Sequence, residues 1–214
     1  MNTSHRFEVE TEQFDHNYLH GRAIENHHTK RFTPWIVKSI KQKYEKLKRP
    51  LVICDFCCGC GDTTSELLQQ IEAQGVQVQQ MIGYDISDEF LTMSKKYATD
   101  KLTFQKCNLE KDFNEEAKFD VMIVLHGFIW MNDLDRAIES SYLALKPEGL
   151  LFSLTLIENR KFYKARLDFM QNPKWCTYFK HGEFELYPFH FSETVYTKIF
   201  DRYFDAVHQE KSQI

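Results

Sequence analysis

The chain has 214 residues, of which 43% are hydrophobic and 27% charged, and its formal net charge is −4 at pH 7. This length suits a single domain, because single domains extend to about 250 residues, and the composition excludes a disordered or fibrous protein. The slightly acidic balance provides no general positive field for a phosphate backbone, so we expect no nucleic-acid partner.

The N-terminal part, residues 1–49, is predicted to be a helical cap. Residues 1–32 are polar with scattered aromatic side chains. Thr33 then suits a helix cap and Pro34 the first helical position, and apolar residues recur at helical spacing as far as Leu47. The opposite face of this helix is rich in lysine, which we interpret as a solvated face, with a nucleic-acid patch as the lesser alternative.

Strands and helices are predicted to alternate in a core over residues 50–157. Apolar runs predict strands over 51–56, 78–84, 102–106, 119–125 and 150–156. Helical spacing lies between them over 64–73, 87–98 and 133–145. This alternation predicts an α/β fold, a Rossmann-like, doubly wound and mostly parallel sheet with helices on both faces. Residues 158–214 are assigned to an aromatic-rich helical lid over the substrate and to the C-terminal end of one domain.

Ligands of such sheets bind at the carboxyl ends of the strands, and the distinctive residues of this sequence follow those ends. The first strand runs into the loop DFCCGCGDTT, where Gly59 and Gly61 let a ligand approach the backbone just before a helix. Asp85 ends the second strand, where an acidic side chain can accept both hydroxyl groups of a ribose.

The third strand end completes a pattern for an adenosine. Asn108 can contact an adenine edge through its amide, and Ile86 and Leu109 can sandwich the ring. Each feature alone is weak, since Asp85 can be a helix-entry residue and Asn108 a turn residue. Their order at three successive strand ends predicts an adenosine cofactor.

The loop favours S-adenosylmethionine over NAD. A dinucleotide fingerprint needs a third glycine where this chain has Thr64. Asp55 also lies in the loop, where it would repel a pyrophosphate and attract an ammonium group. S-adenosylmethionine carries an ammonium group and no phosphate, whereas a NAD-dependent oxidoreductase remains the alternative.

Over residues 33–157 the sequence resembles the class I S-adenosylmethionine-dependent methyltransferases. The matching segments are 55–64, 84–87, 107–110, 119–130 and 145–154. Within that class it is similar to the carboxyl methyltransferases of the trans-aconitate and juvenile hormone acid type. The segments that carry this second similarity are 84–98, 130–132 and 172–179.

The resemblance implies roles for individual residues. Those expected to hold the cofactor are Asp55, Phe56, Cys57, Gly59, Gly61, Asp85, Ile86, Asn108, Leu109 and Leu125. His126 is the candidate catalytic base if the acceptor needs one. Residues expected to line the acceptor pocket are Tyr18, Trp130, Phe162 and Trp175.

Departures from the family pattern are found at several positions. Cys57 and Glu148 stand where the family often has glycine, and Cys57 is expected to fit if its φ is negative. Ile129 replaces the histidine of a His-Trp pair. The chain also ends at Ile214, so the final β-hairpin of this fold is expected to be incomplete.

The cysteines favour a reduced, cytoplasmic chain. Four of the six lie between Cys54 and Cys60, a poor layout for several disulfides, and the single Cys-x2-Cys spacing makes a zinc site the lesser alternative. We expect no metal. Residues 1–14 lack the apolar core of a signal peptide, and no apolar run reaches the about 20 residues that span a bilayer, so no membrane partner is expected.

The acceptor is predicted to be a small molecule. The segment after residue 152 is rich in aromatic side chains and has more basic than acidic residues as far as 185, which suits an apolar pocket with a positive rim. A carboxylate is already ionised near neutral pH, so O-methylation of a small or lipophilic acid needs no base. The alternatives are an inactive cofactor-binding partner subunit, a protein or carrier-bound acceptor, and an aromatic helical core with no pocket.

Overall fold

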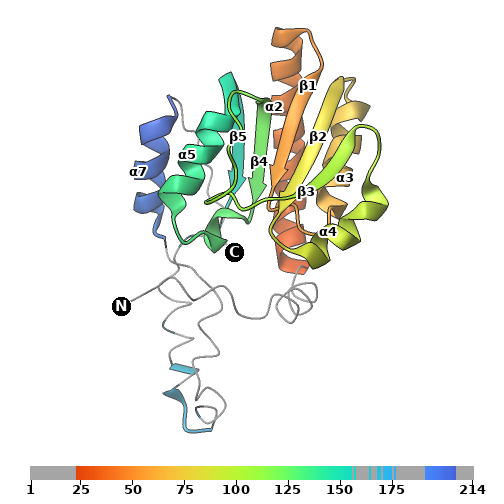
Figure 1. Cartoon of the computed structure of the whole chain (residues 1–214). Coiled ribbons are helices and arrows are strands. Elements are labelled where there is room, and N and C mark those ends of the chain that lie inside the picture. The colour runs from red at the N-terminus through yellow and green to blue at the C-terminus, as the bar shows by residue number, and fades with distance from the viewer. Residues whose placement is uncertain are drawn as a thin grey trace.

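The computed structural model describes residues 23–155 and 191–205 and, between them, positions 157, 164, 168–169, 171–174 and 176 (Figure 1). Within residues 23–28 it describes the backbone alone. Three predicted acceptor-pocket residues, Tyr18, Phe162 and Trp175, and most of the predicted lid lie outside the described residues.

The described sheet has five strands in the order β3-β2-β1-β4-β5, and every neighbouring pair is parallel. The strands are β1 Leu51–Phe56, β2 Val78–Asp85, β3 Leu102–Lys106, β4 Phe119–Leu125 and β5 Leu145–Leu154. This arrangement confirms the predicted Rossmann-like fold. The strand order reverses direction between β1 and β4, and in sheets of this kind ligands bind at the carboxyl ends of the strands at such a reversal.

Helices cover both faces of the sheet (Figure 1). They are α2 Ala23–Leu47, α3 Asp62–Ala73, α4 Asp88–Ser94, α5 Leu134–Ala144 and α7 Glu193–Tyr203, with short 3₁₀ turns η1 Lys95–Tyr97 and η2 Phe128–Trp130. Successive residues of β1 point to opposite faces, as the pleat requires. Ile53 therefore packs in one core with α2 and α3, while Cys54 and Phe56 pack in another with α5 and α7.

Helix α2 begins earlier than the sequence predicted. Its first residue is Ala23, and Pro34 lies inside the helix instead of at its start. Pro34 leaves the Lys30 carbonyl without its usual helical donor, and the Thr33 hydroxyl donates to the neighbouring Thr29 carbonyl at 2.9 Å. This stretch of α2 packs on α3. Lys43, predicted on a solvated face, is 8% exposed and its ammonium donates to the Glu148 carbonyl. Tertiary packing overrides the local signals in both cases.

Strand β5 also begins earlier than predicted, at Leu145 instead of residue 150. Leu145 pairs with Phe119 and Leu150 with Val121, so the four residues between them form an irregularity within the strand. Glu148 lies in this irregularity with φ of +60°, the left-handed conformation that favours glycine.

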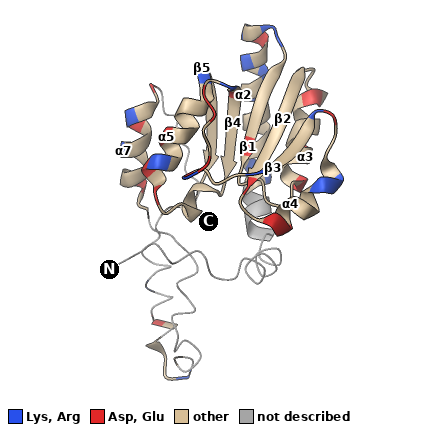
Figure 2. Cartoon of the chain, in the orientation of Figure 1, with Lys and Arg blue, Asp and Glu red and all other residues tan. Residues whose placement is uncertain are grey.

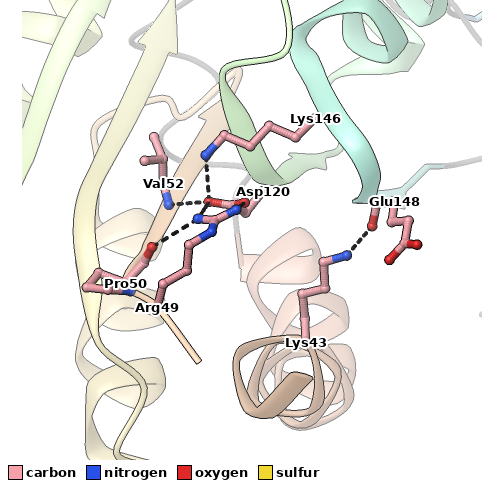
Figure 3. Close-up of polar contacts among 7 residues, drawn as sticks. All are labelled: Lys43, Arg49, Pro50, Val52, Asp120, Lys146 and Glu148. Atoms are coloured by element: carbon pink, nitrogen blue, oxygen red, sulfur yellow. Dashed lines mark hydrogen bonds and ion pairs between the residues drawn. The ribbon is translucent and has the colours of Figure 1, made fainter. Parts of the chain in front are cut away.

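The amino-terminal edge of the sheet is held by one buried carboxylate (Figure 3). Asp120 is 1% exposed and accepts hydrogen bonds from Arg49 at 2.6 and 3.1 Å, from the Val52 amide at 2.9 Å and from Lys146 at 3.0 Å. Burial by itself would raise the pKa of Asp120, but these donors outweigh it and hold the pKa below its ordinary value. The network joins the beginnings of β1, β4 and β5.

Replacing Asp120 with Asn is expected to lower the free energy of unfolding at pH 7 by about 1.5–3 kcal/mol, the range for hydrogen bonds to a charged group. The folded-state pKa lies below the unfolded value of about 3.9, so this stabilisation is present above that value and is lost as pH falls through the folded pKa. Urea titrations near pH 7 and pH 3 check it, with exposed Asp112→Asn as control. If wild type and Asp120→Asn differed in free energy of unfolding by the same amount at both pH values, the stabilising role of the Asp120 charge would be contradicted.

Replacing exposed Glu148 with Gly is expected to raise the free energy of unfolding. A left-handed conformation costs an L side chain about 1–2 kcal/mol, and the extra unfolded-state freedom of glycine offsets part of that, which leaves a gain of about 0.5–1 kcal/mol. The Lys43 contact is to the backbone carbonyl and is retained. Glu148→Ala keeps the Cβ atom and should give no gain; a gain equal to that of glycine would show that the backbone is not the cause.

Candidate functional site

The loop between β1 and α3 is built on left-handed backbone. Cys57, Gly59 and Gly61 have φ of +60°, +56° and +76°, and Gly61 is the N-terminal cap of α3. Cys57 therefore does not meet the condition of a negative φ, and this position carries strain of about 1–2 kcal/mol. A Cβ atom added at Gly59 would meet nothing within 4 Å, so open space lies over the backbone there.

The Phe104 ring packs against this loop, a contact that the sequence did not predict. A Cβ atom at Gly61 would lie 2.7 Å from the Phe104 ring, and one at Gly83 would lie 2.6 Å from it. Phe104 on β3 thus packs against β2 and the loop, and both positions must be glycine. Gly83 in the middle of a strand was the available signal, because such glycines mark close approaches.

The loops after β1 and β4 meet at the reversal of the strand order. A Cβ atom at Gly127 would lie 2.8 Å from the Cys57 Sγ atom. The structure therefore brings Cys57 next to the His126–Gly127 segment. The small size of both residues sets how closely the two loops approach.

Asp55 is a buried carboxyl group at the end of β1. It is 2% exposed and accepts a hydrogen bond from the Thr64 hydroxyl at 2.6 Å. Burial raises the pKa of Asp55 to about 7, the Asp85 and Asp62 charges add to the rise, and the Thr64 bond opposes it. Within the described part of the chain Asp55 makes no ion pair. A cation bound beside it would be stabilised.

Asp85 joins β2 to the glycine-containing loop. Its Oδ2 atom accepts from the Gly59 amide at 2.8 Å, and its Oδ1 atom accepts from the Ser87 amide at 3.0 Å. Burial raises the pKa of Asp85 in spite of these bonds. Each carboxylate oxygen can accept a second bond, so the predicted contact with a ribose stays a prediction.

The residues predicted to contact adenine differ in their exposure and in their hydrogen bonds. The Asn108 Oδ1 atom accepts from the Glu110 amide at 2.9 Å, which closes a turn after β3. Ile86 is 58% exposed at the end of β2, whereas Leu109 is 1% exposed and packs in the core with Phe113. Of the two side chains predicted to sandwich the ring, the structure exposes only Ile86.

The remaining candidates differ in their accessibility. The Phe56 side chain is 1% exposed and stacks on Tyr84 with centroids 5.4 Å apart, so only its backbone faces the site. Leu125 is half-buried at the end of β4, and His126 is 5% exposed with φ of +57°. Trp130 is half-buried in η2, within the loop that leads to α5.

The cysteines of the loop are free thiols. Burial, followed by the nearby carboxylates, raises the pKa of Cys57 and Cys58 well above the ordinary value. These groups are therefore held protonated. Among the residues that the structure describes, no group of three or more His, Cys, Asp or Glu side chains is placed to hold a metal ion.

The site fits a nucleoside that carries a positive charge. Open space lies over Gly59, a buried carboxyl group without an ion pair in the described region lies at Asp55, and an apolar side chain is exposed at Ile86. Residues 57–64 contain no lysine or arginine to bind a phosphate.

Among the described helices, none is long and apolar enough to cross a membrane.

A parallel sheet with this order and this loop defines the chain as a member of the class I, Rossmann-like methyltransferases, whose cofactor is S-adenosylmethionine. The chain matches the ubiE/COQ5 methyltransferase family over residues 29–179 and belongs to that family.

Curated relatives named for several kinds of substrate match part of this chain. A ubiquinone/menaquinone biosynthesis C-methyltransferase of Rickettsia typhi is 28% identical over 107 residues, 48% of this chain and 43% of the relative. A malonyl-acyl-carrier-protein O-methyltransferase of Priestia megaterium is 28% identical, over 48% and 36%. A juvenile hormone acid O-methyltransferase of Drosophila melanogaster is 28% identical, over 53% and 40%. The matched stretch spans less than half the length of each of these relatives.

Solved structures show the same fold at low identity. The YcgJ protein of Bacillus subtilis aligns with a TM-score of 0.59 and 15% identity over 82% of this chain and 67% of its own. The CurJ carbon methyltransferase aligns with a TM-score of 0.57 and 19% identity over 79% and 46%.

The affinity for S-adenosylhomocysteine is expected to rise between about pH 5.5 and pH 7.5. The pKa of Asp55 is about 7 without ligand, and the ligand ammonium group favours the carboxylate, so binding at lower pH must release a proton. Calorimetry in buffers of different ionisation enthalpy measures both the affinity and the number of protons released on binding. We expect about a 3- to 10-fold change per pH unit below 7, up to the tenfold limit of one linked proton. Asp55→Asn should flatten the profile; a wild-type profile that is already flat would exclude this role of Asp55.

Proposed function

We propose that this chain methylates a carboxylate oxygen of a small organic acid with S-adenosylmethionine. The observation that carries the proposal is the burial of His126. It is the titratable side chain at the end of β4, and only 5% of it is exposed. Within the described residues of the β4–α5 segment, no other histidine is present to take a proton from an acceptor.

The protonation state of the acceptor decides which reaction this arrangement suits. A carboxylic acid with a pKa near 4 is ionised at neutral pH, whereas a phenol with a pKa near 10 must lose a proton before it attacks. The cofactor supplies a methyl group on a positively charged sulfur. The protein then needs to align the two reactants, and good alignment is worth about 7–11 kcal/mol.

The charge at the carboxyl edge of the sheet adds a constraint. Acidic residues begin α3 and α4, and Figure 2 shows the acidic positions at the start of α4. An anionic acceptor therefore needs cationic partners from elsewhere. The sequence after β5 contains them, and two of these residues, Lys164 and Lys174, are described as exposed. We propose that the basic residues of 158–180 pair with the acceptor carboxylate.

Methylation of a quinol carbon is the second candidate, because several relatives bear ubiquinone or menaquinone methyltransferase names. A carrier-bound acid is a variant of the first, in line with the malonyl-acyl-carrier-protein relative. Relatives with both kinds of name are similar to this chain, so the buried His126 is the observation that favours the acid.

Transfer of a labelled methyl group to matched acceptors tests the proposal. The panel pairs each free acid with its amide, its carrier-bound form and a quinol. The acids should be methylated and the amides should not, and with saturating cofactor the rate should be independent of pH above the acceptor pKa. His126→Asn, which tolerates a left-handed backbone, should keep the rate within about 3-fold, since loss of a general base costs about 10²–10⁴-fold.

Two results would contradict O-methylation of a small acid. Methylation of the quinol alone, with a loss of about 10²-fold or more in His126→Asn, would replace acid O-methylation with base-assisted C-methylation. Cofactor binding with no transfer to any acceptor would support an inactive partner subunit instead.

A further inference from the structure

Three hydrogen bonds in series cross the carboxyl edge of the sheet, from the loop after β3 to the start of α5. The Asn108 Oδ1 atom accepts from the Glu110 amide at 2.9 Å. A Glu110 carboxylate oxygen accepts from the Asp133 amide. The Asp133 Oδ1 atom in turn accepts from the Arg136 amide at 3.0 Å and caps α5.

The middle bond joins segments that belong to different parts of the site. β3 lies at one edge of the described sheet, and β4, which leads to α5, lies three places along the strand order. Glu110 is half-buried, and after burial and two aspartates its charge also raises the pKa of the Cys57 thiol. Its carboxylate therefore lies within electrostatic reach of the loop after β1 as well as in contact with α5.

The Asp133 end of this series holds the loop that carries Trp130. The turn η2 ends at Trp130, and Asp133 follows three residues later as the cap of α5. The Trp130 amide donates to the Gly127 carbonyl at 3.0 Å and the Met131 amide to the Phe128 carbonyl at 3.3 Å, so local bonds close the turn. The Glu110 contact ties the residues that follow this turn to the loop after β3.

We propose that Glu110 is a positioning residue that links the Asn108 turn, on the cofactor side, to the Trp130 loop, on the acceptor side. Cofactor that settles against the Asn108 turn then shifts Trp130 through one carboxylate. The proposal deepens the proposed function, but it rests on cofactor binding alone and not on the identity of the acceptor.

The chemistry of the contact favours a positional role over a role in stability. The Asp133 amide is exposed, so water can replace Glu110 as its acceptor at little cost. Water does not hold the loop at a fixed distance from Asn108. Loss of the contact should therefore alter the coupling between the two sides more than the unfolding temperature.

Tryptophan emission during titration with S-adenosylhomocysteine tests the link. Wild type should show a change in emission at saturation that Trp130→Phe removes. Glu110→Asp keeps the charge but shortens the side chain, and it should lose that change and bind about 2- to 10-fold more weakly, in line with loss of one hydrogen bond. Glu110→Gln keeps the reach and an acceptor oxygen, and it should behave as wild type.

Glu116→Ala is the matched control, an exposed carboxylate in the same loop that should leave both readouts unchanged. The melting temperature of each variant, followed by circular dichroism, shows that it is folded. An emission change in Glu110→Asp equal to that of wild type would overturn the proposal, and so would a wild-type emission change that Trp130→Phe retains. Wild type that binds no S-adenosylhomocysteine would instead remove the cofactor assignment on which the proposed function also depends.

Discussion

The site depends on the left-handed backbone of residues 57–61 being held between two fixed neighbours. Asp85 accepts the Gly59 amide from one side, and the Phe104 ring fills the space beside Gly61 from the other. The strain at Cys57 persists because these contacts over-determine the loop. The same conformation leaves open space over Gly59, where a cofactor can approach the backbone.

The two ends of the sheet use buried aspartates in opposite ways. Asp120 at the amino edge is surrounded by Arg49, Lys146 and a backbone amide, so its pKa falls and its charge stabilises the fold. Asp55 at the carboxyl edge is buried beside other carboxylates, so burial and those charges raise its pKa to about 7 although the Thr64 hydroxyl donates to it. The first arrangement is complete without a ligand. The second leaves a buried carboxyl group without an ion pair among the described residues, and a cation beside it would be stabilised.

The relatives that match this chain carry names for different acceptors. Proteins named for quinone C-methylation and for carboxyl O-methylation match this chain over similar lengths, and each match covers less than half of the relative. These relatives therefore share the methyltransferase class with this chain and differ in the acceptor that their names give. Within the described residues, Glu110 connects the turn after β3 to the loop that carries Trp130.

The sequence by itself determined the strand and helix alternation and the residues at the strand ends, because apolar periodicity and glycine spacing are local properties of the chain. It misplaced the start of α2, the burial of Lys43 and the sign of φ at Cys57. The packing of Phe104 under Gly61 and Gly83, the carboxyl environment that raises the pKa of Asp55 and the bond from Glu110 to Asp133 were decided only by the tertiary structure. Each of these joins residues from different strands or loops, and no local pattern records which distant side chain will fill a given space or neutralise a given charge.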